Sequence, residues 1–207
     1  MSVKSTLFSK AAAGLNRPFA ELGFARLHPD ESIFAGDFPA WRREHLDADY
    51  LICDLQPWKW GYDPWTGSSF TINLLRTPRD FETTFEHSRM LQTRYLALCD
   101  TGDLERVVAL ENAVRARMRI PTAEEYRQTT GLKIADINRK KYLNRSCPMT
   151  VDELRRTDLW MGYLDEQDIM NWLALLEVWL PKAIQRMASL NDLSGHVFSE
   201  EVRERWR

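Results

Sequence analysis

The sequence predicts an α+β fold: an N-terminal helix, an antiparallel sheet of about four strands, and a helical C-terminal half packed on the sheet. Two observations predict this class. Apolar residues alternate along short segments before Pro78, which is typical of half-buried strands, and recur at intervals of three and four after it, which is typical of helices. Strands grouped together and helices grouped together favour α+β over an alternating βαβ fold.

The first helix is predicted over residues 3–22, because their apolar side chains fall on one stripe of a helix. Gly14 and Pro18 interrupt this stripe, so we expect a kink, or a helix that restarts after Asn16. Gly23 is a natural stop for the helix.

Four strands are predicted in the next region. Residues 24–27 and 32–38 form a first hairpin between turn-forming sequences. Residues 49–56 and 69–75 alternate more clearly and form a second hairpin. The loop that joins this second pair, residues 57–68, is rich in glycine, proline and aromatic residues and is too long for a tight turn.

Helical patterns dominate the rest of the chain. Residues 86–99 are moderately periodic, and the next helix is predicted to use Asp103 as its cap and to end before Pro121. Residues 122–129 predict a short helix that Gly131 closes.

The last third combines a polar segment with the strongest helical pattern. Residues 133–148 are polar and basic, and we interpret them as mostly loop. Apolar residues at spacings of three and four predict a long helix over residues 165–190, which Pro181 should kink or divide.

The size and charge of the chain limit the number of domains and the kinds of partner that we expect. With 207 residues, 44% of them hydrophobic, one domain is predicted over residues 1–193, followed by a charged peripheral tail over 194–207. The net charge of −2 gives no general attraction to nucleic acid or anionic lipid. Because residues 1–13 lack a signal-peptide pattern and no apolar run could span a bilayer, we expect a cytoplasmic protein without membrane contact.

Neither the cysteines nor the histidines show the spacing of a metal site. The three cysteines form no CxxC pair and are expected to be reduced thiols. The four histidines form no HxH or HxxxH pair, so no metal or cofactor is predicted. These residues are Cys53, Cys99, Cys147, His28, His45, His87 and His196.

Three short motifs resemble a bacterial family classed only as a domain of unknown function. They are Gly23-Phe24 after the first helix, Gln56 at the end of a strand, and Phe70-Thr71-Ile72-Asn73 in the next strand. The resemblance covers residues 5–76. It implies an α+β fold and a bacterial source, and it implies no activity.

The loop between the two clearest strands is the best candidate for a binding site. It places Trp58, Trp60, Tyr62 and Trp65 within eight residues. Exposed rings would form an anchor patch for a partner, because aromatic residues dominate the energetics of interfaces. The alternative is that two or three of the rings fold back over the sheet and seal the core.

Two other features have both a functional and a structural interpretation. Gln56 and Asn73 lie on neighbouring predicted strands, where they could present amide groups beside the aromatic loop or could satisfy loop backbone groups. The basic run over residues 139–145 could touch nucleic acid, with Tyr142 available to stack on a base, or could be a solvated loop.

The leading hypothesis is a non-enzymatic protein-binding module, in one version an immunity-like or accessory factor, whose partner binds Trp58, Trp60, Tyr62, Trp65, Gln56 and Asn73. No catalytic residue is predicted, since nucleophile motifs such as GxSxG and Gly-rich phosphate loops are absent. One alternative is an enzyme with a pocket between sheet and helices, assembled from Gln56, Asn73 and distant carboxylates or histidines. A second alternative is a nucleic-acid-associated protein that uses the basic run.

Overall fold

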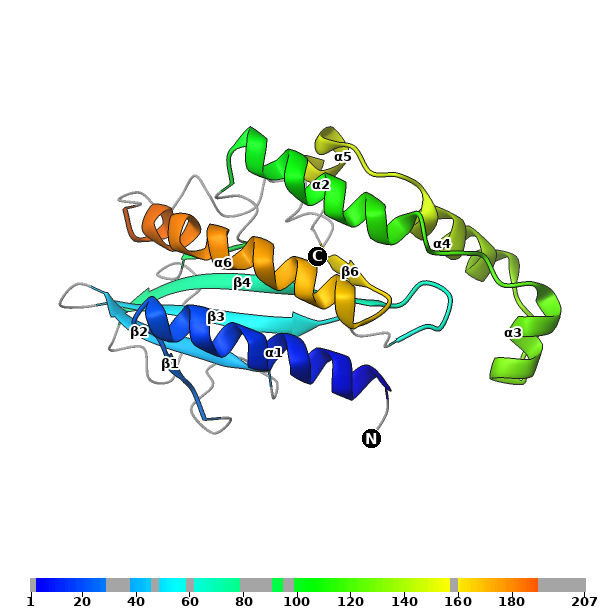
Figure 1. Ribbon diagram of the computed structural model, residues 1–207, viewed down its shortest axis with the longest axis horizontal. Helices are drawn as coiled ribbons and strands as arrows, with labels where there is room; N and C mark the ends of the chain where they lie inside the picture. The colour runs from blue at the N-terminus through cyan, green and yellow to red at the C-terminus, as the bar shows by residue number, and fades with distance from the viewer. Residues whose placement is uncertain are drawn as a thin grey trace. The chain divides into compact units, whose positions relative to one another are not determined.

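The computed structural model describes residues 3–28, 38–45, 49–58, 62–78, 91–94, 99–156 and 160–189. Within these residues, one helix is followed by five strands, then by four helices, a short strand and a last helix (Figure 1). In chain order they are α1 (Val3–Glu21), β1 (Ala25–Arg26), β2 (Ala40–His45), β3 (Asp49–Pro57), β4 (Ser68–Pro78), β5 (Leu91–Arg94), α2 (Thr101–Arg115), α3 (Ala123–Thr130), α4 (Asp136–Ser146), α5 (Val151–Arg156), β6 (Met161–Tyr163) and α6 (Glu166–Ser189).

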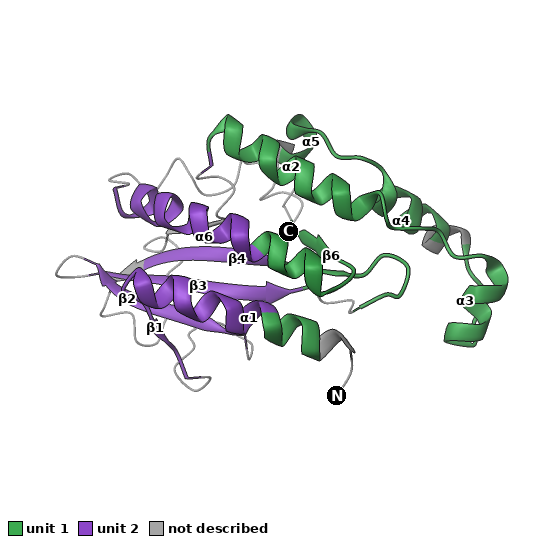
Figure 2. Cartoon of the chain, viewed as in Figure 1, with its two compact units in different colours: residues 1–10, 58–70, 100–172 green, residues 11–57, 71–99, 173–207 purple. Residues whose placement is uncertain are grey.

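The chain forms two compact units (Figure 2). Unit 1 consists of residues 1–10, 58–70 and 100–172, and unit 2 consists of residues 11–57, 71–99 and 173–207. Helices α1 and α6 and strand β4 contribute residues to both units. One domain over residues 1–193 stays a prediction, and the predicted tail over 194–207 lies outside the described residues.

The strands form one sheet in the order β1-β2-β3-β4-β5, and β6 pairs with the first residues of β4. The pairs β1–β2, β2–β3, β4–β5 and β4–β6 are antiparallel. The predicted α+β class, with its N-terminal helix, antiparallel sheet and helical C-terminal half, is therefore confirmed. The path from β1 to β5 contains five strands rather than four. The fifth strand, β5, lies within segment 86–99, for which a helix was predicted.

Strand β2 is one of the elements that the sequence pattern did not predict. Of the hairpin strand predicted over residues 32–38, all but Phe38 lies outside the described residues, and β2 follows it at Ala40–His45. Four of its six residues, Arg-Arg-Glu-His, are charged or titratable. The guanidinium of Arg42 lies over the ring of Tyr50 and that of Arg43 over the ring of Phe24, so aromatic rings cover these cations.

Helix α1 is continuous through Pro18, so the predicted restart after Asn16 is wrong. Pro18 falls in the last turn, where the missing N–H removes only one hydrogen bond before the helix ends at Glu21. In unit 2, Gly14 faces helix α6, and a Cβ at this glycine would lie 2.4 Å from the Cδ1 atom of Leu173. The glycine in the apolar stripe thus permits close helix packing.

The core of unit 2 lies between the sheet and these two helices (Figure 1). Phe19 of α1 stacks on Trp41 of β2 with ring centroids 4.5 Å apart. The indole N–H of Trp41 donates to the Asn16 side chain at 3.0 Å, which satisfies the polar atom of a ring that is only 1% exposed.

Three expectations for the helical half of the chain differ from the structure, at least in part. Helix α2 begins after Asp100, whose side chain accepts a hydrogen bond from the Asp103 backbone N–H at 2.9 Å, so Asp100 and not Asp103 is the cap. The segment expected to be a loop contains helix α4, whose polar composition left no apolar stripe to recognise. Helix α6 runs through Pro181 as one helix, so of the two expected alternatives, a kink or a division, the division does not occur.

The short helix α3 is confirmed with both of its ends. Thr122 and Glu125 form a capping box, in which each side chain accepts a hydrogen bond from the backbone N–H of the other residue. Gly131 ends the helix in the left-handed conformation with φ at 73°. Among the helices that the structure describes, none is long and apolar enough to cross a membrane.

Candidate functional site

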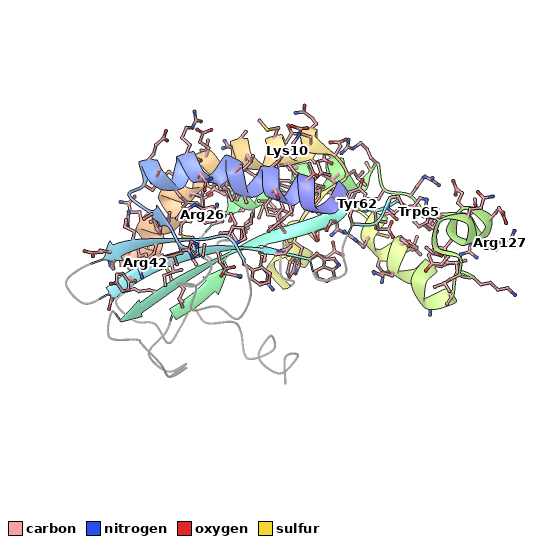
Figure 3. All side chains as sticks on the ribbon, turned by 90° about the horizontal axis from the view of Figure 1, so that it is seen from below. Lys10, Arg26, Arg42, Tyr62, Trp65 and Arg127 are labelled. Atoms are coloured by element: carbon pink, nitrogen blue, oxygen red, sulfur yellow. The ribbon has the colours of Figure 1, made fainter. Side chains whose placement is uncertain are left out.

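Trp65 of the aromatic loop is sealed in a cluster of rings in unit 1. It is 5% exposed, stacks on Tyr126 of α3 at 5.8 Å and meets Tyr142 of α4 edge-on at 6.0 Å. Figure 3 shows Trp65 among the side chains beside α3 and α4. We call Trp65, Tyr126 and Tyr142 the closed cluster, since these three buried rings cover one another.

A turn at Asp63 fixes the position of Trp65. One carboxylate oxygen of Asp63 accepts hydrogen bonds from the backbone N–H groups of Trp65 at 2.8 Å and Thr66 at 3.0 Å. The other oxygen accepts from the Tyr142 hydroxyl at 2.7 Å. Burial and this hydrogen bond raise the pKa of Tyr142 far above its ordinary value, so the phenol keeps its proton and donates.

Gly67 allows this turn to lie against strand β6. Its φ is +65°, and a Cβ at this position would lie 1.9 Å from the Tyr163 carbonyl oxygen. No other residue fits there without moving the backbone.

Tyr62 is half-buried and held in place. Its hydroxyl donates to the backbone carbonyl of Leu164 at 2.8 Å. Burial raises the pKa of Tyr62, and the nearby Asp165 carboxylate adds to the rise. Trp60 lies outside the described residues, so of the four rings in the predicted site the structure places Trp58, Tyr62 and Trp65.

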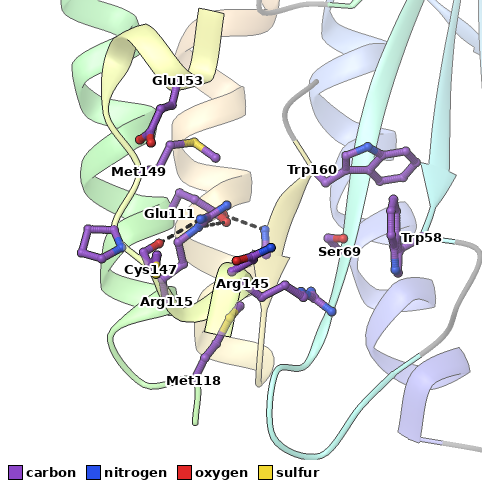
Figure 4. Close-up of a pocket in the computed structure, with 13 residues that line it drawn as sticks. Trp58, Ser69, Glu111, Arg115, Met118, Arg145, Cys147, Met149, Glu153 and Trp160 are labelled. Atoms are coloured by element: carbon purple, nitrogen blue, oxygen red, sulfur yellow. Dashed lines mark hydrogen bonds and ion pairs between the residues drawn. The ribbon is translucent and has the colours of Figure 1, made fainter. Parts of the chain in front are cut away.

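Trp58 lies at a cavity of about 490 Å³ within unit 1 (Figure 4). The ring is half-buried and meets Trp160 edge-on, with centroids 4.8 Å apart. Its indole nitrogen is buried and has no hydrogen-bond partner in the described part of the chain. The wall combines aromatic rings, thioethers, two arginines and two glutamates: Trp58, Ser69, Glu111, Arg115, Met118, Asn144, Arg145, Cys147, Pro148, Met149, Glu153, Trp160 and Gly162.

The two glutamates of the cavity hold the fold together. Glu111 is 3% exposed, and its carboxylate accepts from the backbone N–H of Gly162 at 3.0 Å and from Arg115 Nε at 2.8 Å. The hydrogen bond from Gly162 joins β6 to α2, whereas the ion pair with Arg115 lies within α2. Glu153 closes the start of α5, because its carboxylate accepts from the backbone N–H of Thr150 at 2.8 Å and from the Thr150 hydroxyl at 3.0 Å.

The two arginines differ in how many of their donors are occupied. Arg115 pairs with Glu111 through Nε and donates from Nη1 to the Cys147 carbonyl at 2.9 Å. Arg145, at the end of α4, makes one polar contact within the described residues, from Nη1 to the Thr66 hydroxyl at 3.3 Å. Burial lowers the pKa of Arg145, opposed by the carboxylates of Glu111 and Asp63.

Gln56 and Asn73 share one face of the sheet in unit 2. The Asn73 amide donates to the Asp54 carboxylate at 2.9 Å and to the Gln56 side-chain oxygen at 3.1 Å. Asn73 is 7% exposed and Asp54 is 2% exposed. The Asn73 amide therefore binds the Gln56 side chain and a buried carboxylate, and neither Gln56 nor Asn73 lines the cavity of unit 1.

The basic run lies on helix α4 rather than on a loop. Tyr142 is 6% exposed within the closed cluster, so it does not offer a free face for stacking on a base. Arg139, Lys140 and Lys141 lie on exposed positions of the same helix.

Cysteines and histidines stay separate wherever the structure describes them. Cys53 is buried, Cys99 is half-buried and Cys147 is exposed, and none of the three forms a disulfide bond with a described residue. Burial raises the pKa of the Cys53 thiol well above its ordinary value. Among the described residues no group of three or more His, Cys, Asp or Glu side chains could hold a metal ion, and His87 and His196 lie outside these residues.

No family model matches the chain, and neither the curated proteins nor the solved structures include one that is significantly similar to it. The resemblance over residues 5–76 therefore stays a prediction. The cavity itself is the basis on which a function can be argued.

Sequence reasoning did not identify the polar half of the cavity wall. Glu111 and Arg115 come from α2 and Arg145 comes from α4, and only folding brings them to the cavity that Trp58 lines. Arg145 had one signal, since it closes the basic run, but that run was interpreted as solvated charge.

Proposed function

We propose that the protein is a non-enzymatic binding module, and that a segment of its protein partner enters the cavity beside Trp58. One observation carries this proposal: Trp58 and Trp160 form an aromatic wall, and the buried indole N–H of Trp58 has no acceptor among the described residues. A buried indole N–H normally has a partner, so a carbonyl oxygen of a bound segment would complete it.

The environment of Trp58 supports the role of an anchor. Trp65 and Tyr62 of the same loop are engaged within unit 1, whereas Trp58 remains half-buried beside an open volume. Aromatic residues in such pockets supply most of the binding energy at protein interfaces. Trp58 is therefore the residue of the predicted site that supports partner recognition best.

The chemistry of the cavity favours binding over catalysis. A general acid or base needs a titratable group that can exchange a proton with a substrate. Both glutamates in the wall already accept backbone hydrogen bonds, at the Gly162 N–H and at the Thr150 N–H. Their carboxylates are thus engaged in holding β6 and α5.

The wider setting of this module remains part of the proposal. An immunity-like or accessory factor of bacterial origin fits a compact protein that binds without reacting. A cytoplasmic location is supported by Cys53, Cys99 and Cys147, which form no disulfide bond within the described residues, because reduced cysteines are usual in reducing compartments.

Peptide display on the immobilised full chain tests the function. Peptides retained by the wild type should bind the Trp58→Ala variant at least about tenfold more weakly, as expected for the loss of an aromatic anchor. The matched control is Leu132→Ala, since Leu132 is an apolar residue of unit 1 that is 63% exposed and does not line the cavity.

The control variant should bind the selected peptides as the wild type does. The proposed function is wrong if the wild type retains no more peptides than Trp58→Ala does, or if the selected peptides bind both proteins equally.

A further inference from the structure

The cavity wall contains equal numbers of positive and negative side chains, but these side chains differ in how many hydrogen bonds they make. Arg115 and Arg145 supply two positive charges, and Glu111 and Glu153 supply two negative charges. The glutamates and Arg115 each make two or more polar contacts inside unit 1. Among the residues that the structure describes, Arg145 makes a single long hydrogen bond, to Thr66, although a guanidinium carries five N–H donors.

An unpaired guanidinium in a half-buried position is costly for the fold. Transfer of a charge from water into a protein is compensated only when the charge is paired and hydrogen-bonded. Within the described residues no carboxylate forms an ion pair with Arg145. Its position is therefore suited to an anion that comes from outside the chain.

Apolar groups lie around this cation. Met118 is 7% exposed and lines the same cavity, as do Pro148 and Met149. In Figure 4 Trp58 and Trp160 lie on one side of the cavity, Arg115 and Glu111 on the other, and Arg145 between them. A ligand that contacts both parts of the wall carries an anionic group on an apolar body.

We propose that Arg145 binds the carboxylate of a ligand whose apolar or aromatic body packs against Trp58 and Met118. This inference rests on the proposed function and names the chemistry of the group that the cavity recognises. The planar guanidinium matches a carboxylate through two parallel hydrogen bonds.

The balance of charge selects a carboxylate over a phosphate. One negative charge pairs with Arg145, whereas a second would face Glu111 and Glu153 in the same wall. Like charges in a partly buried site repel strongly because the surroundings screen them poorly. A monoanion is therefore preferred to a dianion.

The size of the cavity limits the source of the carboxylate. A volume of about 490 Å³ is within the range of sites for small molecules and accommodates a terminal residue or a small acid. The free carboxyl end of a partner chain with an apolar last residue fits the proposed binding module, and a free apolar carboxylic acid shares the same chemistry.

Calorimetric titration of the full chain tests the inference. Peptides selected from a display library with randomised, free carboxyl termini are synthesised as the acid and as the C-terminal amide. The acid should bind at least about tenfold more tightly than the amide, because the amide removes the charge that pairs with the guanidinium. N-acetylphenylalanine and phenyl phosphate are titrated as small probes, and the carboxylate should bind more tightly.

Three variants complete the experiment. Arg145→Gln should abolish the preference for the acid, and Arg145→Lys should retain only part of it, because lysine keeps the charge without the planar fork. Arg139→Gln is the matched control, since it removes the same charge from an exposed position of the same helix. Circular dichroism verifies each fold, and the acid–amide comparison on the wild type requires no variant.

Each outcome decides a different point. Equal binding of acid and amide, with dependence on Trp58, overturns the carboxylate and leaves the proposed function standing. Arg145-dependent binding of N-acetylphenylalanine without any peptide supports the carboxylate site and refutes a protein partner. Tighter binding of phenyl phosphate, or binding of all probes that is unchanged in Arg145→Gln, overturns the inference.

Discussion

Trp58 and Trp65 come from the same loop of unit 1 and have opposite environments. Trp65 is 5% exposed and contacts two further rings, Tyr126 and Tyr142, in the closed cluster. Trp58 is half-buried, meets one ring edge-on and borders a cavity of about 490 Å³. The comparison shows that a run of aromatic residues can seal a core at one end and line a cavity at the other.

The polar atoms near the two rings also differ in whether they have hydrogen-bond partners. Around Trp65, the Asp63 carboxylate satisfies two backbone N–H groups and one hydroxyl. Around Trp58, the indole N–H has no acceptor among the described residues, and Arg145 has only the Thr66 hydroxyl. Buried polar groups normally have hydrogen-bond partners, so the indole N–H of Trp58 needs an explanation that the polar groups around Trp65 do not.

The largest expected effect is on the stability of the closed cluster. Trp65→Ala should lower the free energy of unfolding by about 3–5 kcal/mol, since truncation of a buried aromatic ring leaves a cavity. Trp58→Ala should cost less than half of that, because its ring is already in contact with open volume. Urea denaturation followed by circular dichroism measures both values, and equal losses would remove the contrast between the two rings.

The Asp63 turn should rank second. Asp63→Ala removes the acceptor of three hydrogen bonds and leaves the Tyr142 hydroxyl without its partner, so we expect a loss of about 2–3 kcal/mol. Asp63→Asn keeps an oxygen acceptor and should lose less. If denaturation gives the same stability for both variants, the turn does not hold the closed cluster.

The cap of helix α3, which carries Tyr126, should show a smaller and pH-dependent effect. A hydrogen bond from Arg119, together with the Thr122 backbone, lowers the pKa of Glu125 from 4.5 to about 2. A carboxylate with a lowered pKa stabilises the fold above the unfolded value and loses this contribution as the pH falls toward the folded value.

Wild type and Glu125→Gln should therefore differ in melting temperature at pH 6, with the wild type higher, and converge between pH 4.5 and about pH 2. The difference should be small because the Arg119–Glu125 pair is exposed. Thermal scans across this range measure it, and a gap that persists at pH 2 would exclude the ionised cap as its origin.

The smallest effect on stability is expected at Arg145. Arg145→Gln removes the cost of a half-buried charge and also the hydrogen bond to Thr66, so the free energy of unfolding should not fall and should rise by no more than about 0.5 kcal/mol. The same denaturation experiment measures this value. A loss comparable to that of Asp63→Ala would show that Arg145 is a structural residue of the closed cluster.

The pattern of apolar residues was sufficient for much of the fold. The alternation in residues 49–56 and 69–75 predicted β3 and β4, and the spacing in residues 165–190 predicted α6. Residues 122–129 and Gly131 predicted α3 and its C-terminal end, because the residue that ends a helix is adjacent to it in the chain. Charged β2 and polar α4 were missed, since neither has an apolar face that a local window reveals.

The sequence predicted only part of the candidate site. An aromatic loop could be recognised as a place where rings gather, but exposure is not a property of the loop. Trp65 is buried by rings from residues 126 and 142, whereas Trp58 contacts Trp160 and lines a cavity together with arginines of two distant helices, α2 and α4. Local order follows from neighbours along the chain, whereas burial, pairing of charge and the cavity depend on contacts between distant segments, which exist only after folding.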